Sequence, residues 1–419
     1  MAKIFVSIAS YRDPELLPTL ESLLTNAANP EDLTICIAWQ HAEEDAWDTL
    51  ELYKDDSRFK IIDIPYLEAK GVCSARHEIQ KLLIDEDYYF QLDSHHRFSK
   101  DWDIILKDYI NFLKARGHKK PIISSYLPGY FPKNDPDGRN IEVWGLNIDR
   151  FMPAGVPFLR PYTIDNWREL KEPFPSRFLS GHFIFAPASF TREVPYDPNL
   201  YFHGEESSLA GRAYTNGYDI FAPHRPIVWH EYTREGKTKH WDDSTDWADR
   251  DKNSYTRFRK IFDMDDVPCS PCQRNALGPY GLGTERSLAD FEKYVGLKFK
   301  TRQIHEQTLN NELPPIKGDF ESGLASKQKV CIDVYKGALV DEDYDNIAVA
   351  LLDKEGSDMH RQDMTGQELL ALIKSDPNDK FVHIWREFES VNPPYKWRVW
   401  PHSTSKGWLD VIENIIGYE

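Results

Sequence analysis

The chain has 419 residues, of which 41% are hydrophobic and 13% aromatic. This is enough apolar material for the cores of one to three globular domains, and it excludes an intrinsically disordered chain. Because 68 Asp and Glu residues outnumber 51 Lys and Arg residues, the net charge of −17 argues against nucleic acid or an anionic membrane surface as a bulk partner.

Two further properties of the composition bear on location. The sequence contains no run of about 18 uncharged apolar residues, so no membrane-spanning helix is expected. The apolar run that follows Met1 directly is unlike a signal peptide, and we predict a cytoplasmic protein. The five cysteines are few and odd in number, which fits reduced thiols; the lone pair Cys269 and Cys272 could hold zinc, but surface thiols are the simpler interpretation.

The first hundred residues alternate between strand-like and helix-like patterns. The expected strands are residues 3–10, 34–39, 59–64 and 88–92, and the expected helices are 14–24 and 71–83. Later strand-like runs are 182–186, 219–222 and 226–229, with a helical stretch that begins near 204. Strands that alternate with helices predict a mainly parallel sheet covered on both faces, which is an α/β fold.

The remaining sequence divides into two parts. Residues 233–325 are rich in charge, Pro and Gly, and we expect irregular structure with one helix near 287–295. From residue 328 new strand candidates appear, at 330–335, 346–352, 380–385 and 396–400, and a capping box at Thr365 and Glu368 precedes an apolar helix. We therefore expect a domain over 1–250, an extension and linker over 251–327, and a small β-rich α+β domain over 328–419. The tryptophans of this last domain could stack on sugars or pack in its core: Trp385, Trp397, Trp400 and Trp408.

The residues just beyond the strand ends are the candidate site, because ligands of α/β sheets bind beyond the carboxyl ends of the strands. Asp93 and His95 follow the fourth strand, and residues two apart in an extended chain point to the same side. One carboxylate and one imidazole with open positions suit Mn²⁺ or a similar cation; the alternative is a polar loop. His230, after a later strand, is the candidate third ligand, with competitors His203, His224 and His240.

Two other groups stand out. Arg76 lies one turn into a helix that begins at Gly71, where the helix N-terminus and a guanidinium could hold a diphosphate; an ordinary surface arginine is the alternative. Glu205 and Glu206 open another helix after Gly204 and could bind sugar hydroxyls or act as a general base. The basic segment 232–241 could close over the site as a lid or could be a solvated loop.

Several ordered motifs resemble one known family. They are residues 4–16, 71–76, 91–98, 202–206, 212–219, 230–234 and 283–288. Over residues 3–300 the sequence resembles the polypeptide N-acetylglucosaminyltransferases that act on hydroxyproline. It is also similar in layout to the mucin-type N-acetylgalactosaminyltransferases, which use an Asp-x-His motif and a distant His on their metal. Residues 328–419 have no obvious counterpart in the hydroxyproline setting, which leaves the acceptor open.

The resemblance implies a GT-A (Rossmann-like) nucleotide-sugar-binding domain, a UDP-sugar donor, Mn²⁺ or another divalent cation such as Mg²⁺, and retention of anomeric configuration. It implies metal ligands at Asp93, His95 and His230, and catalytic roles for Arg76, Glu205 and Glu206. The expected donor-binding residues are Ser7, Ala9, Ser10, Tyr11, Arg12, Asp13, Arg76, Asp93, Ser94, Gly181 and His182.

The sequence therefore predicts a metal-dependent glycosyltransferase that moves a sugar, with N-acetylglucosamine the first choice, from a UDP-sugar to a hydroxyl of a protein or glycan. In a retaining reaction the leaving phosphate can take the proton of the acceptor. Three alternatives stay open: a UDP-hexose-dependent transferase for a non-protein acceptor, a nucleotide-sugar hydrolase, and a non-catalytic binding protein. An oligomer formed through 328–419 is also an option.

Overall fold

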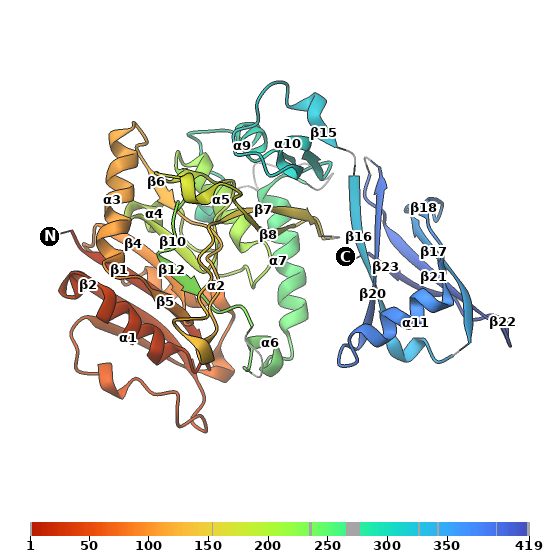
Figure 1. Ribbon diagram of the computed structural model, residues 1–419, viewed down its shortest axis with the longest axis horizontal. Coiled ribbons are helices and arrows are strands. Elements are labelled where there is room, and N and C mark those ends of the chain that lie inside the picture. Colours follow the sequence, from red (N-terminus) through yellow and green to blue (C-terminus); the bar gives the residue numbers. More distant parts are fainter. Residues whose placement is uncertain are drawn as a thin grey trace.

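The computed structural model describes residues 2–152, 154–233, 237–264, 277–325, 327–341, 343–390 and 392–416. Its main body is built on an eight-stranded sheet with the order β3-β2-β1-β4-β10-β6-β11-β9 (Figure 1). The strands of this sheet are β1 (Ile4–Tyr11), β2 (Leu33–His41), β3 (Phe59–Pro65), β4 (Tyr88–Asp93), β6 (Pro121–Ile123), β9 (Phe174–Pro175), β10 (Phe183–Pro187) and β11 (Asp219–Ala222). The α/β fold class predicted from the sequence is confirmed.

The predicted strand directions hold for only half of the sheet. β3, β2, β1 and β4 are parallel, but β10 is antiparallel to both β4 and β6, and β9 is antiparallel to β11. The sheet is therefore mixed and not mainly parallel. A strand buried on both faces has the same apolar pattern in either direction, so its sequence does not fix its direction.

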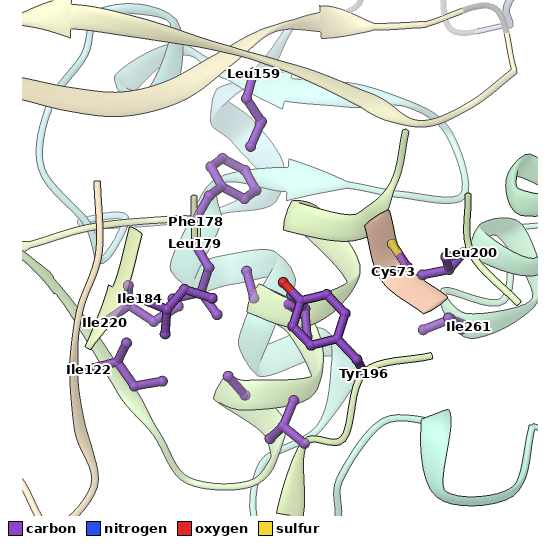
Figure 2. Close-up of a cluster of buried hydrophobic side chains, with 14 of the residues drawn as sticks. Cys73, Ile122, Leu159, Phe178, Leu179, Ile184, Tyr196, Leu200, Ile220 and Ile261 are labelled. Carbon is purple, nitrogen blue, oxygen red and sulfur yellow. The ribbon is translucent and has the colours of Figure 1, made fainter. Parts of the chain in front are cut away.

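The main body contains nine described helices, several of which cover the two faces of the sheet. They are α1 (Leu16–Asn26), α2 (Val72–Gln80), α3 (Trp102–Ala115), α4 (Ser189–Glu193), α5 (Glu205–Thr215), α6 (His240–Asp243), α7 (Trp247–Ile261), α9 (Leu288–Val295) and α10 (Glu306–Leu309). Val6 and Ile8 of β1 pack in one core with α1 and α3, while Phe5 packs in a second core with α2, α5 and α7. Figure 2 shows part of this second core, with Cys73, Tyr196 and Leu200 among its side chains. Alternate side chains of β1 are thus buried on opposite faces.

Helix α7 lies in a segment that the sequence indicated to be irregular, and that prediction was wrong. The helix is strongly polar, and its buried residues include Ser254, Phe258 and Ile261. Phe258 packs against Phe262 and Phe299, with ring centroids 4.6 and 6.3 Å away. Tertiary packing of one narrow face stabilises this helix. Because its apolar residues are few, the helix has a weak periodic signal in the sequence.

Three small sheets accompany the main one in the described part of the main body. β5 (His96–Phe98) pairs with β12 (Val228–His230) in antiparallel register, which places His230 directly opposite His96. β7 (Trp144–Phe151) and β8 (Pro157–Thr163) form a long hairpin. The segment that follows α9 adds the short strands β13 (Leu297–Lys298), β14 (Gln303–His305) and β15 (Leu324–Ala325).

The C-terminal part has a core of its own, made of residues between 330 and 416. Its elements are β16 (Lys327–Tyr335), β17 (Tyr344–Leu352), β18 (Asp358–Arg361), β19 (Met364–Thr365), α11 (Gly366–Ser375), β20 (Phe381–Glu389), β21 (Lys396–Ser403), β22 (Gly407–Trp408) and β23 (Ile412–Ile415). The expected capping box begins α11. Of the four tryptophans, Trp397 is in the core, whereas Trp385, Trp400 and Trp408 are exposed.

The C-terminal part meets the main body at the β7–β8 hairpin (Figure 1). Arg150 lies between two rings, 4.3 Å from that of Phe158 and 4.5 Å from that of Trp385. Lys329 Nζ lies 3.5 Å from Asp149 Oδ1. Polar and cation–π contacts of this kind are typical of an interface between units that fold separately. Among the described residues, no helix is long and apolar enough to cross a membrane.

The separate core leads to a prediction about truncation. We expect a chain that ends at residue 327 to stay folded and to keep metal-dependent UDP binding, because the apolar core of 330–416 is not shared with the main sheet. Circular dichroism and calorimetry with Mn²⁺ and UDP measure the two properties. An insoluble truncated chain would show that the boundary cuts through the main fold.

Candidate active site

A cavity of about 480 Å³ opens beyond the carboxyl ends of β1 and β4 and at the start of α5. The predicted site residues that line it are Ala9, Tyr11, Arg76, Asp93, Ser94, His95, Gly181, His182, Glu205, Glu206 and His230. The predicted residues Ser7, Ser10, Arg12 and Asp13 are not among its lining residues. The tertiary structure thus gathers residues from the two halves of the main body around one cavity.

Asp93, His95 and His230 form a cluster that could hold a metal ion. Asp93 Oδ2 lies 3.7 Å from His95 Nε2 and 3.5 Å from His230 Nε2, and one donor atom of each residue lies within 4.8 Å of the others. Donors of this type around one point suit a divalent first-row cation. The pairing of β5 with β12 places His230 here, because it brings the end of β12 beside the turn after β4.

The second ring nitrogen of His95 has a carboxylate partner. Asp13 Oδ2 lies 2.6 Å from His95 Nδ1 and also accepts a hydrogen bond from Ser94 Oγ at 2.7 Å. A metal-binding histidine commonly donates its other N–H to a carboxylate, which fixes the tautomer and leaves the free lone pair on Nε2. Asp13 is buried, so its place in the structure is beneath the cluster rather than on the cavity wall.

Neither ring nitrogen of the buried His230 makes a well-aligned hydrogen bond within the described residues, and the nearest polar atom to Nε2 is Asp93 Oδ2 at 3.5 Å. Burial lowers the pKa of His230 to about 3, so its imidazole is neutral and can use a lone pair to bind a metal. A buried imidazole without a well-aligned partner is costly unless something fills the position. The residues present therefore fit a bound cation.

Two more histidines stand behind the cluster. His96 Nε2 accepts a hydrogen bond from Asp93 N at 3.2 Å, and its Nδ1 lies 2.9 Å from Trp229 O. His182 stacks on His230, with ring centroids 4.1 Å apart. Burial holds the pKa of His96 and that of His182 well below the usual range, so both rings pack as neutral groups. No pattern in the sequence indicated that His96 would hold the Asp93 backbone.

Arg76 makes different contacts from those expected of a free guanidinium. It is buried, and its terminal nitrogens donate to Asp93 Oδ1 at 2.5 Å and to Glu205 Oε1. Tyr196 Oη donates to the same Glu205 oxygen at 2.6 Å. Arg76 therefore links α2, the end of β4 and the start of α5, which holds Asp93 in place at the metal cluster.

Glu206 differs from Glu205 in its contacts. Its two oxygens accept hydrogen bonds from Gly181 N and Tyr126 Oη, each at 2.7 Å, and burial raises its pKa from 4.5 to about 7. Gly204, with φ of 90° in the left-handed region, makes the turn that begins α5 just before the two glutamates. Glu206 is thus the carboxyl of this pair that can change its charge near neutral pH. Tyr126 carried no signal in the sequence.

The segment after β1 is tied to its neighbours. Tyr11 Oη donates to Asp243 at 2.7 Å, and Arg12 is paired with Asp45 at 2.7 Å and with Asp243 at 3.1 Å. These ion pairs hold Arg12 away from the cavity wall, whereas Tyr11 lines it. The role of residues 7–13 in donor binding stays a prediction.

The segment that we considered as a lid packs against the site. Tyr232 Oη donates to Leu127 O at 2.8 Å, and Lys237 pairs with Glu231. The two ring nitrogens of His240 lie 2.7 Å from Tyr201 Oη and 3.0 Å from Ala69 O, so this competitor of His230 is engaged elsewhere. Arg234, which belongs to segment 232–241, lies outside the described residues, as do Cys269 and Cys272.

A comparison with protein families gives a match over most of the chain. Residues 3–58 and 50–301 match the model of a protein family described as Glycosyltransferase (GlcNAc). The match covers well over half of the chain, and the chain belongs to this family. The nucleotide-sugar-binding fold expected from the sequence is consistent with membership of this family. A comparison with curated proteins found no match.

Solved structures whose chains follow a similar path share little sequence identity with this chain. GalNAc-T7, crystallised with UDP, GalNAc and Mn²⁺, has a TM-score of 0.48 and 14% identity over 69% of this chain. The match spans 56% of the GalNAc-T7 chain. Residues 1–349 of S. aureus TarS give a TM-score of 0.37 and 14% identity, covering 66% of this chain and 80% of that one.

The metal cluster generates a prediction for His230. We expect His230→Ala to weaken binding of Mn²⁺ and of UDP with Mn²⁺ by about tenfold or more, since a ligand to the ion is lost. His224→Ala and His240→Ala, which change histidines outside the cluster, are the controls and should keep near-normal affinity. Isothermal titration calorimetry measures both. Equal affinities for His230→Ala and the unchanged protein would remove His230 from the ligand set.

Glu206 generates a prediction about pH. Its folded pKa is raised, so the folded state binds this proton more tightly than the unfolded state, and the stability that it contributes is lost as pH rises through about 7. We expect the melting temperature of the metal-free protein to fall less between about pH 5 and about pH 8 in Glu206→Gln than in the unchanged protein. Glu78→Gln, which changes a glutamate paired only with Lys81 at the surface, is the control. An identical fall in all three proteins would contradict the assignment.

Proposed function

We propose that this protein is a metal-dependent glycosyltransferase that moves N-acetylglucosamine from UDP-N-acetylglucosamine to a hydroxyl group. The observation that carries the proposal is the cluster of Asp93, His95 and His230 on the cavity wall, with Asp13 bonded to His95. Membership of a family described by GlcNAc supports the choice of sugar.

Asp93, His95 and His230 would hold the cation, preferably Mn²⁺. The bound cation supplies Lewis-acid stabilisation of the negative charge that develops on the leaving diphosphate. The three side chains come from two chain segments, so the ion also ties β4 to β12. Ser94 and His95 are held by Asp13, which orients the cluster before a ligand arrives.

The donor would lie between β1 and α5. Ala9, Tyr11 and Gln40 line one end of the cavity and would contact the uridine, while Gly181, Glu205 and Glu206 line the other. We assign Arg76 first to positioning, because it holds Asp93 and Glu205. Its predicted contact with the diphosphate would need phosphate oxygens to replace one of these carboxylates.

The two glutamates would have separate tasks. Glu205 is fixed by Arg76 and by Tyr196, so it would shape the pocket that receives the sugar. Glu206 can be protonated or ionised near neutral pH and would bind a sugar or acceptor hydroxyl. We propose a retaining reaction, in which the leaving phosphate takes the proton of the acceptor; in an inverting reaction Glu206 would be the base.

The exposed aromatic rings at the cavity mouth suit several kinds of acceptor. Phe202 and Trp241 are exposed, line the cavity and meet edge to face at 5.5 Å. Such rings can stack on a sugar or on a proline ring. A polypeptide hydroxyl, as for the hydroxyproline enzymes that the sequence resembles, is our first choice, a glycan is the second, and we keep a cytoplasmic location as part of the proposal.

A donor screen tests the proposal. Purified protein with Mn²⁺ should release UDP from UDP-N-acetylglucosamine faster than from other nucleotide sugars, and EDTA should stop the release reversibly. Asp93→Ala should reduce the rate by about a hundredfold or more while the protein stays folded. Asp358→Ala, which changes an exposed carboxylate of β18 in the C-terminal part, is the control and should keep the full rate.

The products separate the rival functions. Free N-acetylglucosamine as the sole product with every acceptor offered would identify a nucleotide-sugar hydrolase. UDP-sugar binding without turnover under all conditions would identify a binding protein. Transfer of sugar to a peptide or glycan would support the proposal and name the acceptor.

A further inference from the structure

A second group of metal-binding side chains lies on the C-terminal part, away from the active-site cavity. Cys331 and Asp333 of β16 and His383 of β20 offer donor atoms within 4.8 Å of one another. Asp333 is directly opposite His383 in the antiparallel register, and Cys331 is two residues before Asp333 on the same side. Alternate residues of β20 are exposed, so all three side chains belong to the outer face of this pair of strands.

The distances between the donor atoms match a tetrahedral ion. Cys331 Sγ lies 3.3 Å from Asp333 Oδ1 and 3.9 Å from His383 Nδ1, and Asp333 Oδ1 lies 2.7 Å from His383 Nδ1. Tetrahedral Zn²⁺ with ordinary bond lengths separates such donors by about 3.3 to 3.6 Å. The Cys331–Asp333 distance lies in that range, whereas the Asp333–His383 distance is shorter and the Cys331–His383 distance is longer, by shifts that side-chain rotations can supply.

A fourth residue orients the imidazole. Asp379 Oδ2 lies 2.9 Å from His383 Nε2, the ring nitrogen that faces away from Cys331. The other oxygen of Asp379 accepts from Phe381 N at 2.8 Å, which fixes the carboxylate in place. This is the carboxylate–histidine arrangement found behind ligating histidines, and it repeats the relation of Asp13 to His95 in the main body.

A thiol nucleophile activated by His383 is the other reading of these residues. The imidazole, however, is closer to Asp333 than to the thiol, so its Nδ1 is engaged by the carboxylate. A carboxylate beside the sulfur disfavours a free thiolate, whereas a cation at the centre of the three donors would stabilise thiolate and carboxylate together. The geometry thus suits a ligand set better than a catalytic dyad.

We propose that Cys331, Asp333 and His383 bind Zn²⁺ or a similar thiophilic cation, with the fourth position open to water. A thiolate ligand selects zinc-like ions over Mn²⁺ and Mg²⁺, whose preferred donors are oxygen atoms. The protein would then carry two metals of different chemistry, one at each cluster. This inference does not depend on the proposed transferase activity.

The position of the site gives it a structural consequence. Lys329 and Trp385, on the same outer face, contact Asp149 and Arg150 of the β7–β8 hairpin. An ion that joins β16 to β20 beside these contacts would stiffen the face through which the C-terminal part meets the main body. Metal binding here should therefore stabilise the whole chain and leave the donor site unchanged.

Cobalt spectroscopy tests the site directly. The full-length chain with Cys269→Ser and Cys272→Ser, kept reduced, is titrated with Co²⁺, so that those two cysteines cannot contribute a thiolate signal. We expect a thiolate-to-cobalt charge-transfer band and the intense visible bands of tetrahedral cobalt, both displaced by Zn²⁺. Cys331→Ser should abolish the charge-transfer band, and Asp379→Asn should weaken cobalt binding by about tenfold.

Controls separate loss of the site from loss of folding. Glu387→Gln changes an exposed carboxylate two positions beyond Trp385 on the same face and should keep the full signal. Cys331→Ser should melt at the same temperature as the parent without metal, and only the parent should gain stability from Zn²⁺. No charge-transfer band, or a band that survives in Cys331→Ser, overturns the proposal. Asp93→Ala should leave the band intact, so failure of the donor-site assignment is distinguishable.

Discussion

The buried guanidinium of Arg76 is the constraint on which the main body depends. A charged group removed from water must be paired, and here its partners are Asp93 and Glu205, with Tyr196 bonded to the same glutamate. Arg76 belongs to α2, Asp93 ends β4 and Glu205 begins α5, while Tyr196 lies in the chain before α5. The need to pair one charge therefore positions one carboxylate of the metal cluster and one of the glutamates at the cavity.

The cluster itself combines local and long-range structure. His95 takes its orientation from Asp13, which follows β1, and Asp93 takes the direction of its backbone from His96. His230 is held by the pairing of β12 with β5 and by ring contacts with His182 and Tyr232. Pre-oriented ligands lose little conformational freedom when an ion arrives, and this is the physical advantage of a supported site.

The two candidate metal sites show one device used with different donors. In each, a carboxylate bonded to the far nitrogen of a histidine turns the near nitrogen towards a shared point. Replacement of an imidazole by a thiolate changes the preferred ion from Mn²⁺ to a softer one.

The sequence by itself determined the α/β class, the strands up to β4, the separate apolar rhythm after residue 328 and the cap of α11, because these depend on local periodicity and capping. It also singled out Asp93, His95 and His230 as polar residues after apolar runs. Only the tertiary structure decided that β10 runs antiparallel, that the polar α7 is a helix, and that Arg76 is shared between Asp93 and Glu205. Strand direction, burial of a polar helix face and the pairing of a buried charge depend on contacts between distant segments, and no local pattern encodes them.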